Sequence, residues 1–195
     1  MEADNKQAKD KPVLFFEHRE AWGLWLEENH RESAGLWLQL AKKTAGLASV
    51  NYADALEVAL CYGWIDGQKQ AHNEQFWLQK FTPRGARSPW SRINREKVLL
   101  LIERGEMRAA GLREIERAQA DGRWHAAYDS PGTATVPADF QLALEANPQA
   151  LAFFATLKSS QRYAMLFRIQ TVKKAETRAR KIQQFTEMLA RGETA

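Results

Sequence analysis

The chain has 195 residues, of which 45% are hydrophobic and 27% are charged, and its formal net charge is +4 at pH 7. This length allows one large domain or two small ones, each with a buried core, and no apolar run reaches the roughly 20 residues that a membrane-spanning helix needs. The charged N-terminal residues 1–12 lack the hydrophobic stretch of a secretion signal, so we expect them to form a disordered tail of a cytoplasmic protein.

The first elements alternate between helical and strand patterns. Apolar residues recur at helical spacing over residues 15–28 and predict an amphipathic helix with one apolar stripe. Residues 35–40 alternate leucine with other residues, as a short strand does. Asn51 is a suitable N-cap for a further helix, which we expect to end at Gly63 in a left-handed conformation.

Two further strands are predicted at residues 65–71 and 75–81, joined by a hairpin turn. Together with residues 35–40 they predict a small sheet of about three strands, mainly antiparallel. Ser91 is expected to cap a helix that ends at Gly105, and residues 109–121 form the next helix. The side chains that we expect the first of these helices to turn inward are Ile93, Val98, Leu99 and Ile102.

The C-terminal part has a purely helical pattern. Residues 128–136 are polar and rich in turn-forming residues, and we interpret them as a linker between an N-terminal domain of residues 13–127 and a helical segment of residues 137–195. Helices are expected to begin at Pro137 and at Asn147–Pro148. Ser159 or Ser160 is expected to cap one last long helix, which reaches Gly192. The fold class predicted is α+β: a small, mainly antiparallel sheet packed with helices, followed by an all-helical C-terminal segment.

Residues 51–94 contain the strongest candidate for a binding site, because tryptophans, basic side chains and polar side chains are concentrated there. Interleaved basic and aromatic groups suit a phosphorylated ligand or single-stranded nucleic acid, although tryptophans at this density also suit a core. Asp66 is a candidate base or ligand group, and the alternative is a turn-capping aspartate. The candidate ligand-binding residues are Trp64, Asp66, Lys69, Arg84, Ser88, Trp90, Ser91 and Asn94.

Motifs of the common enzyme classes are missing from the sequence. The four histidines have no metal-ligand spacing, and the single cysteine, Cys61, rules out an intrachain disulfide or a multi-cysteine zinc site. Its apolar neighbours favour a small buried side chain over a nucleophile. The sequence contains no glycine-rich phosphate loop, no G-x-S-x-G and no H-E-x-x-H. We therefore expect no metal, no cofactor and a binding protein rather than an enzyme.

The last forty residues carry an excess of basic side chains. A basic helix of this kind could contact nucleic acid, anionic lipid or an acidic partner, and a solvated face is the alternative. The residues that would contact nucleic acid are Lys173, Lys174, Arg178 and Lys181.

Several segments together resemble a bacterial family, the YdeI/OmpD-associated or bacteriocin-protection proteins. They are Ala59–Gly67, Phe81–Arg84, Ser88–Ser91 with Asn94, Met107–Gly111, Asp121–Trp124, Pro137–Phe140, Asn147–Pro148 and Lys173–Ile182. The resemblance covers roughly residues 15–192. It implies a role in tolerance to bacteriocins and cationic antimicrobial peptides and brings no catalytic residues with it.

Three hypotheses follow from the sequence. The first is a binding protein for an unknown protein or a small anionic ligand, with a groove formed by Trp64, Asp66, Arg84, Trp90 and Asn94. The second is a nucleic-acid-binding protein. The third is an enzyme on a small anionic substrate, with Asp66 as base and Arg84 as anion clamp.

Overall fold

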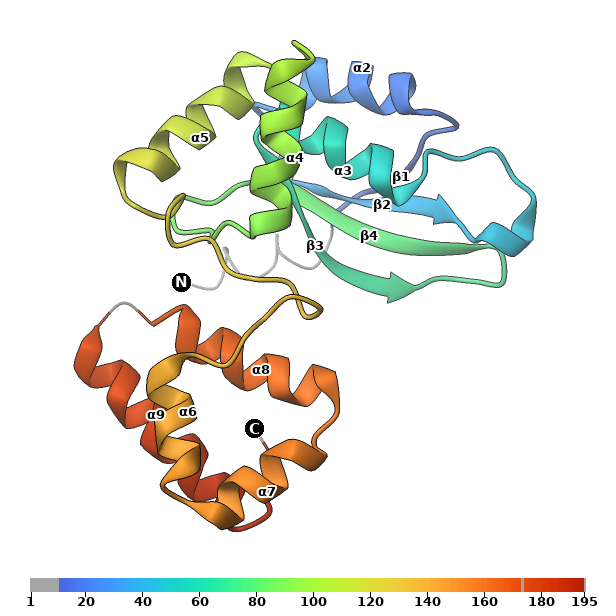
Figure 1. Ribbon diagram of the computed structural model, residues 1–195. Coiled ribbons are helices and arrows are strands. Elements are labelled where there is room, and N and C mark those ends of the chain that lie inside the picture. The colour runs from blue at the N-terminus through green and yellow to red at the C-terminus, as the bar shows by residue number, and fades with distance from the viewer. Residues whose placement is uncertain (1–10, 173, 195) are drawn as a thin grey trace, which may run out of the picture. The chain divides into compact units, whose positions relative to one another are not determined.

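The computed structural model describes residues 11–172 and 174–194, which divide into two compact units (Figure 1). The first unit runs up to Ser88 and includes Glu96–Gly122. The second unit contains Pro89–Arg95 and the residues from Arg123 onward, including residues 128–136, which we interpreted as a linker. The tail expected at residues 1–12 lies outside the described residues except for its last two, and Pro12 accepts a backbone hydrogen bond from Trp37 (2.9 Å).

Four strands form the sheet of the first unit, in the order β1-β2-β4-β3 (Figure 1). Their bounds are β1 Val13–Phe15, β2 Leu36–Ala41, β3 Trp64–Ala71 and β4 Phe76–Pro83. The pairings β2–β4 and β3–β4 are antiparallel, as expected, and β1 pairs with β2 in parallel. The predicted hairpin is confirmed. In its turn, Asn73 Oδ1 accepts hydrogen bonds from the amides of Gln75 and Phe76 (2.9 and 2.8 Å).

The strand β1 corrects the prediction that a helix begins at Phe15. The helix α2 covers Arg19–Asn29 and starts after His18, whose Nδ1 accepts a hydrogen bond from the amide of Ala21 (3.3 Å). Phe15 is the last residue of β1, and its ring packs edge-on against Phe76 at 5.8 Å between centroids. A three-residue strand is too short to show an alternating pattern of apolar residues. Its partner β2 also follows it by more than twenty residues in the sequence, so no local pattern indicates the pairing.

Helices α2 and α3 lie on one face of this sheet (Figure 1). The helix α3 covers Tyr52–Cys61, after a short 3-10 helix at Lys43–Ala45. The predicted N-cap is confirmed, because Asn51 Oδ1 accepts from the amide of Asp54 (3.0 Å), and Gly63 has the expected positive φ of 74°. The core between helices and sheet includes Trp22, Leu26, Leu36, Leu38, Ala59, Trp64 and Phe81.

The helices α4 (Arg92–Glu103) and α5 (Ala109–Ala120) agree with the predicted helices, but the inward face of α4 differs from the prediction. Val98 is buried, as expected, and so is Leu101. The side chains of Ile93, Leu99 and Ile102 are 45%, 51% and 41% exposed, so these three assignments were wrong. The buried residues Val98 and Leu101 are three positions apart and lie on one face of α4. Because α4 contains six aliphatic residues, its sequence is compatible with more than one apolar face.

Four helices follow in the second unit: α6 (Ala138–Glu145), α7 (Pro148–Thr156), α8 (Ser159–Gln170) and α9 (Ala175–Ala190). The predicted start of α7 is confirmed, because Asn147 Oδ1 accepts from the amide of Ala150 (3.1 Å). The prediction of one long last helix was wrong, since α8 and α9 are separate. Ser159 is the first residue of α8, and the side chain of Gln161 caps its start by accepting from the amide of Lys158 (3.0 Å).

The α+β fold class predicted from the sequence is confirmed: a mixed four-stranded sheet with helices, followed by helices alone. The core of the four C-terminal helices consists of Phe140, Leu144, Ala150, Phe154, Leu157, Met165, Leu166, Ile169, Ile182, Phe185 and Leu189. Among the described residues, none of the helices has the length and apolar character that crossing a membrane requires.

Candidate functional site

The predicted site residues on β3 have different environments. Trp64 is buried in the core, where its Nε1 donates to the carbonyl of His30 (3.1 Å) and its ring meets Trp22 edge-on at 6.3 Å between centroids. Asp66 lies within the strand and not in a turn, which corrects the turn-capping alternative. Its Oδ2 accepts a hydrogen bond from the hydroxyl of Tyr52 (2.7 Å).

A bulge in β3 separates Asp66 from Lys69, whose side chain is exposed. The buried amide of Gln79 donates to the carbonyls of Gly67 (2.9 Å) and Gln68 (3.2 Å). These hydrogen bonds satisfy carbonyls that the interrupted ladder leaves unpaired. The sequence did not identify Gln79, because its role depends on the irregular register of the facing strand.

Arg84 follows β4 and is buried, with its backbone amide donating to Gly63 (2.9 Å) and its carbonyl accepting from Nη2 of Arg117 (3.2 Å). Ser88 closes a turn by donating its amide to the carbonyl of Gly85 (3.0 Å). The backbone of both residues is therefore held firmly in the first unit.

The remaining predicted residues belong to the second unit. Trp90 is buried, and its ring packs edge-on against Trp124 at 5.1 Å between centroids. Ser91 is confirmed as the cap of α4, because its Oγ accepts from the amide of Asn94 (3.1 Å). The side chain of Asn94 is itself buried.

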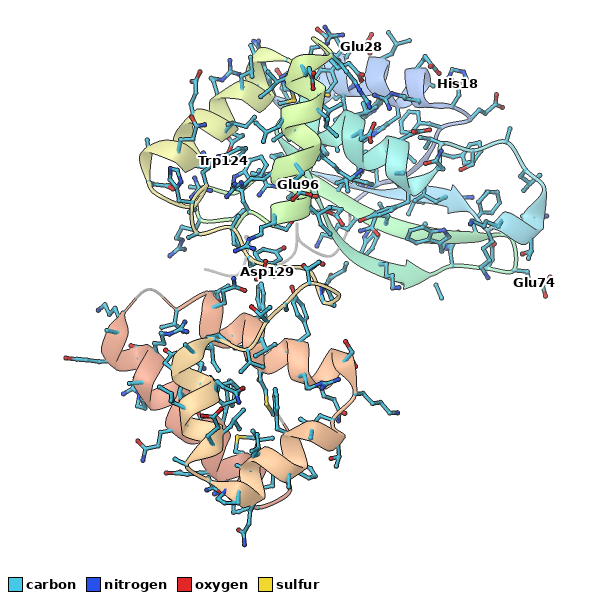
Figure 2. All side chains as sticks on the ribbon, viewed as in Figure 1. His18, Glu28, Glu74, Glu96, Trp124 and Asp129 are labelled. Carbon is cyan, nitrogen blue, oxygen red and sulfur yellow. The ribbon has the colours of Figure 1, made fainter. Side chains whose placement is uncertain are left out.

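An ion pair anchors the first turn of α4 within the second unit. Arg92 Nη1 lies 2.8 Å from Oδ1 of Asp129, a buried carboxylate that Figure 2 labels. The carbonyl of Asp129 also accepts from the hydroxyl of Tyr163 (2.9 Å). Trp64, Asp66, Lys69, Arg84 and Ser88 thus lie in one unit and Trp90, Ser91 and Asn94 in the other, and the single groove expected from them stays a prediction.

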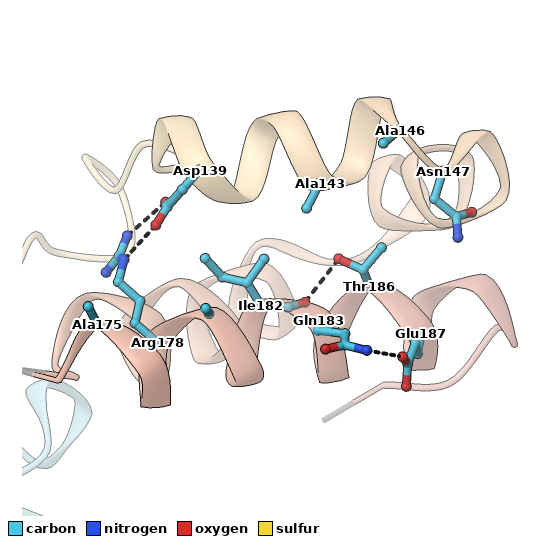
Figure 3. Close-up of a pocket in the computed structure, with 11 residues that line it drawn as sticks. Asp139, Ala143, Ala146, Asn147, Ala175, Arg178, Ile182, Gln183, Thr186 and Glu187 are labelled. Carbon is cyan, nitrogen blue, oxygen red and sulfur yellow. Dashed lines mark hydrogen bonds and ion pairs between the residues drawn. The ribbon is translucent and has the colours of Figure 1, made fainter.

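The second unit contains a hollow of about 590 Å³ between α6 and α9. In Figure 3 the two helices run alongside one another, with the side chain of Ala143 of α6 pointing toward α9 and Ala146 at the C-terminal end of α6. Ala175 and Ala179 line it from α9 and are exposed. Alanine has the smallest side chain apart from glycine, so the backbones of both helices are accessible to a third element here. We call this hollow the α6–α9 groove.

Hydrogen-bonded pairs of polar side chains line the α6–α9 groove. Arg178 donates to both carboxylate oxygens of Asp139, from Nε at 2.6 Å and from Nη2 at 2.9 Å, as the paired dashed lines in Figure 3 show. This bidentate contact lowers the pKa of Asp139 below its usual range. Gln183 donates to Glu187 (2.9 Å) farther along α9. The groove therefore combines an alanine floor with charged and amide groups.

Two of the basic residues expected to contact nucleic acid make side-chain contacts within the second unit. Arg178 is paired with Asp139, and the ammonium group of Lys181 lies 5.5 Å from the ring centroid of Phe185. Lys174 is exposed at the start of α9, and Lys173 lies outside the described residues. The nucleic-acid hypothesis stays a prediction.

The first unit has a larger hollow, of about 650 Å³, where α2, α3 and the loop between α4 and α5 meet. We call it the α2–α3 hollow. It is lined by Arg19, Glu20, Gly23, Leu24, Glu27, Val58, Cys61, Tyr62, Gly105, Glu106 and Arg108. Its volume is in the range of small-ligand sites, about 300–1,000 Å³.

A network of charges forms one wall of the α2–α3 hollow. Arg19 donates to Glu57 from Nη1 (3.1 Å) and to Glu106 from Nη2 (2.5 Å), and its Nη1 lies 3.7 Å from Asp54. Lys97 Nζ lies 3.4 Å from the other oxygen of Glu57. Burial alone would raise the pKa of Glu57, but its hydrogen bonds to these cations outweigh that effect and lower it.

The opposite wall contains Tyr62, whose hydroxyl donates to Glu27 Oε2 (2.6 Å). Burial and this hydrogen bond raise the pKa of Tyr62, so the phenol keeps its proton at neutral pH. Cys61 is buried at the floor, and burial raises the pKa of its thiol to about 11. The thiol is therefore neutral near pH 7, in agreement with the structural role expected for it.

The sequence did not identify either hollow as a site. The two small residues Ala175 and Ala179, four positions apart on α9, are the sequence signal that could have indicated the α6–α9 groove. The residues of the α2–α3 hollow come from segments as far apart as Arg19 and Arg108, and no local motif joins them.

Two matches to known families cover most of the chain. Residues 133–192 match the family described as "Bacteriocin-protection, YdeI or OmpD-Associated". Residues 14–114, more than half of the chain, match a family described as a domain of unknown function, DUF8412. Neither a search of curated proteins nor a search of solved structures gives a significant match.

Proposed function

Residues 133–192 match the family of bacteriocin-protection, YdeI or OmpD-associated proteins, and a DUF8412 domain precedes them. We propose that the chain supports tolerance to bacteriocins and cationic antimicrobial peptides by binding a protein partner. The observation that carries the proposal is the α6–α9 groove, all of whose lining residues lie within residues 133–192. The partner would insert one helix between α6 and α9.

The side chains of the groove suit a helix better than a small anion. Ala143, Ala146, Ala175 and Ala179 leave room for a helix backbone to come close, as small residues do at helix–helix contacts. The groove has a small-ligand volume of about 590 Å³, but its floor is apolar and open along the helices. Arg178, the cation that an anion would need, already binds Asp139 through two hydrogen bonds.

Binding explains this arrangement better than catalysis. A catalytic site needs a nucleophile or an acid–base pair placed over a substrate, with a pKa near the working pH. In the groove, the pKa of Asp139 is lowered by Arg178, which makes the carboxylate a poor base. An exposed alanine surface, by contrast, supplies apolar area that a partner removes from water on docking.

Survival of a deletion strain under graded doses of a bacteriocin and of a cationic antimicrobial peptide tests the proposal. The strain is complemented with the wild type or with Ala179→Leu, which fills the groove from an exposed position on α9. We expect the wild type to restore survival and Ala179→Leu to fail, with both proteins equally folded and abundant.

The matched control is Ala155→Leu, which makes the same change at an exposed position of α7 outside the groove. It should restore survival as the wild type does. Equal rescue by Ala179→Leu would remove the groove from the proposal. Failure of the wild type itself would remove the protective role.

A further inference from the structure

The α2–α3 hollow has features of a ligand site that are independent of the protective role. It lies wholly in the first unit, its polar groups come from three separate segments, and its floor is formed by apolar side chains of α2 and α3.

Gly23 lies in the interior of α2, where glycine destabilises a helix by comparison with alanine. Packing does not demand this glycine. A Cβ built on it would meet its nearest neighbour, Cγ1 of Val58, at 3.7 Å, an ordinary contact distance. Gly111 is the opposite case, since its Cβ would lie 2.4 Å from the carbonyl oxygen of Cys61. The missing side chain at Gly23 instead enlarges the hollow that this residue lines.

The charged groups around the hollow favour a cation. The carboxylates of Glu20, Glu27 and Glu106 line it, and they face the guanidinium groups of Arg19 and Arg108. Arg19 is engaged by Glu106 and, from behind the wall, by Glu57 and Asp54. Other cations pair with the same carboxylates, namely Lys97 with Glu57, Arg104 with Glu106 and Arg108 with Glu27. With Glu20 included, the carboxylates of this network exceed its cations by one. The local field is therefore negative, although the whole chain carries +4.

The apolar side chains of the α2–α3 hollow indicate a second chemical feature of its ligand. Leu24 is 68% exposed on α2, one helical turn from both Glu20 and Glu27, and Val58 lines the hollow nearby. A ligand that spans these groups needs an aliphatic chain beside its positive charge.

We propose that the α2–α3 hollow binds an aliphatic primary ammonium group, with the ammonium near Glu20 and Glu27 and its methylene chain along Gly23, Leu24 and Val58. This site goes beyond the proposed protective function, because it lies in the domain of unknown function and uses none of the residues of the α6–α9 groove. The same chemistry occurs in a free polyamine and in a lysine side chain of a peptide.

Isothermal titration of the full chain with cadaverine and with a short peptide of leucine and lysine tests the proposal. The same peptide with its lysines acetylated keeps the chain length and removes the charge. We expect saturable binding of a charged probe, none of the acetylated peptide, and weaker binding as salt is raised. Tighter binding of the peptide would identify a lysine side chain as the source, and tighter binding of cadaverine would identify a free polyamine.

Two variants locate the site. Glu27→Gln should lower the affinity about two- to fivefold, the range of a partly exposed ion pair, and Gly23→Leu should lower it by about tenfold or more by filling the hollow. Gly23→Leu should not lower the thermal midpoint, because leucine is the better helix former. The control Glu116→Gln removes the same charge from an exposed position of α5 outside the hollow and should bind as the wild type does.

Three results would overturn the proposal: no saturable binding of either charged probe, equal binding of the acetylated peptide, or full affinity in both Gly23→Leu and Glu27→Gln. The variant Ala179→Leu separates the two proposals, because it alters the α6–α9 groove and should leave ammonium binding unchanged.

Discussion

The α2–α3 hollow of the first unit and the α6–α9 groove of the second are built in opposite ways. The hollow is walled by side chains that also hold its unit together, above all Arg19, which joins α2 to α3 and to Glu106. The groove is lined by small side chains such as Ala175 and Ala179, which are exposed and make little contact. A change at the ion-paired Arg19 of the hollow should therefore affect stability and binding together, whereas a change at the exposed alanines of the groove should affect binding alone.

This difference has a physical origin. The first unit closes a sheet with helices through large aromatic side chains, and Trp22, Trp25 and Trp64 pack against one another in its core. Helices α6 and α9 bury Phe140, Leu144, Ile182, Phe185 and Leu189 on their inner faces. The exposed positions of α9 that line the groove include the small residues Ala175 and Ala179.

The largest expected effect in the first unit follows from Trp22→Ala. Trp22 is completely buried, lies 5.7 Å from Phe81 between ring centroids, and donates from Nε1 to the carbonyl of Ala55 (3.0 Å). Its removal should lower the free energy of unfolding by about 3–5 kcal/mol. Urea unfolding followed by far-ultraviolet circular dichroism measures this. The control Leu24→Ala should change it by less than about 0.5 kcal/mol, and equal effects of the two would contradict the assignment of the core.

Arg19→Met tests whether the wall of the hollow supports the fold. It leaves Glu57 and Glu106 without their shared cation and should cost about 1.5–3 kcal/mol, the usual range for hydrogen bonds to charged groups. The pKa of Glu57 is lowered in the folded chain, so its stabilisation is present above the usual glutamate pKa of about 4.3 and is lost as the pH falls through the lower, folded value. The difference between wild type and variant should shrink in acid.

A double-mutant cycle of Arg19→Met with Glu57→Gln supplies the control for that prediction. The two losses should be less than additive, because each variant removes the same ion pair. Strict additivity, or a difference that is constant down to pH 2, would show that Arg19 stabilises the fold in another way.

Gly111→Ala tests how closely α5 packs on α3. The added Cβ would meet the carbonyl oxygens of Cys61 at 2.4 Å and of Leu60 at 2.7 Å, so α5 must shift. We expect a loss of about 1–3 kcal/mol in thermal or urea unfolding. Gly132→Ala in the second unit has nothing within 4 Å of the new methyl group and should change stability by less than about 0.5 kcal/mol. A harmless Gly111→Ala would refute the close approach.

The smallest expected effect is that of Asp139→Asn beside the groove. Its ion pair with Arg178 is 48% exposed on the aspartate side, and such pairs contribute less than about 1 kcal/mol. Because the pKa of Asp139 is lowered, the contribution is present above the usual aspartate pKa of about 3.9 and is lost as the pH falls through the folded value. Unfolding curves at pH 7 and pH 2 should differ between wild type and variant only at pH 7.

Local chemistry was predictable from the sequence wherever a few neighbouring residues decide the structure. The caps at Asn51, Ser91 and Asn147 are all confirmed by hydrogen bonds to backbone amides. The β3–β4 hairpin, the positive φ of Gly63 and the α+β class were predicted for the same reason. In each case the energetic preference acts over a single turn of chain.

Other features depend on contacts between distant segments, and the sequence did not predict them. The strand β1 exists through its pairing with β2, the buried stripe of α4 was selected among several aliphatic stripes, and the helical pattern before Gly192 is divided into α8 and α9. Trp64 and Trp90, candidates either for a ligand site or for a core, are buried. Hydrophobicity indicates that a side chain leaves water, but not whether it enters a core or a binding site.

The sequence by itself therefore determined the class of fold, the caps and hairpin, and the family that residues 133–192 match. Only the tertiary structure decided where its hollows lie. Arg19, Tyr62 and Glu106 meet around one cavity because α2, α3 and the loop before α5 pack together. Ala143 and Ala179 line the same groove because α6 and α9 run side by side. A cavity forms where packed elements leave space unfilled, so residues that are neighbours in the sequence do not reveal it.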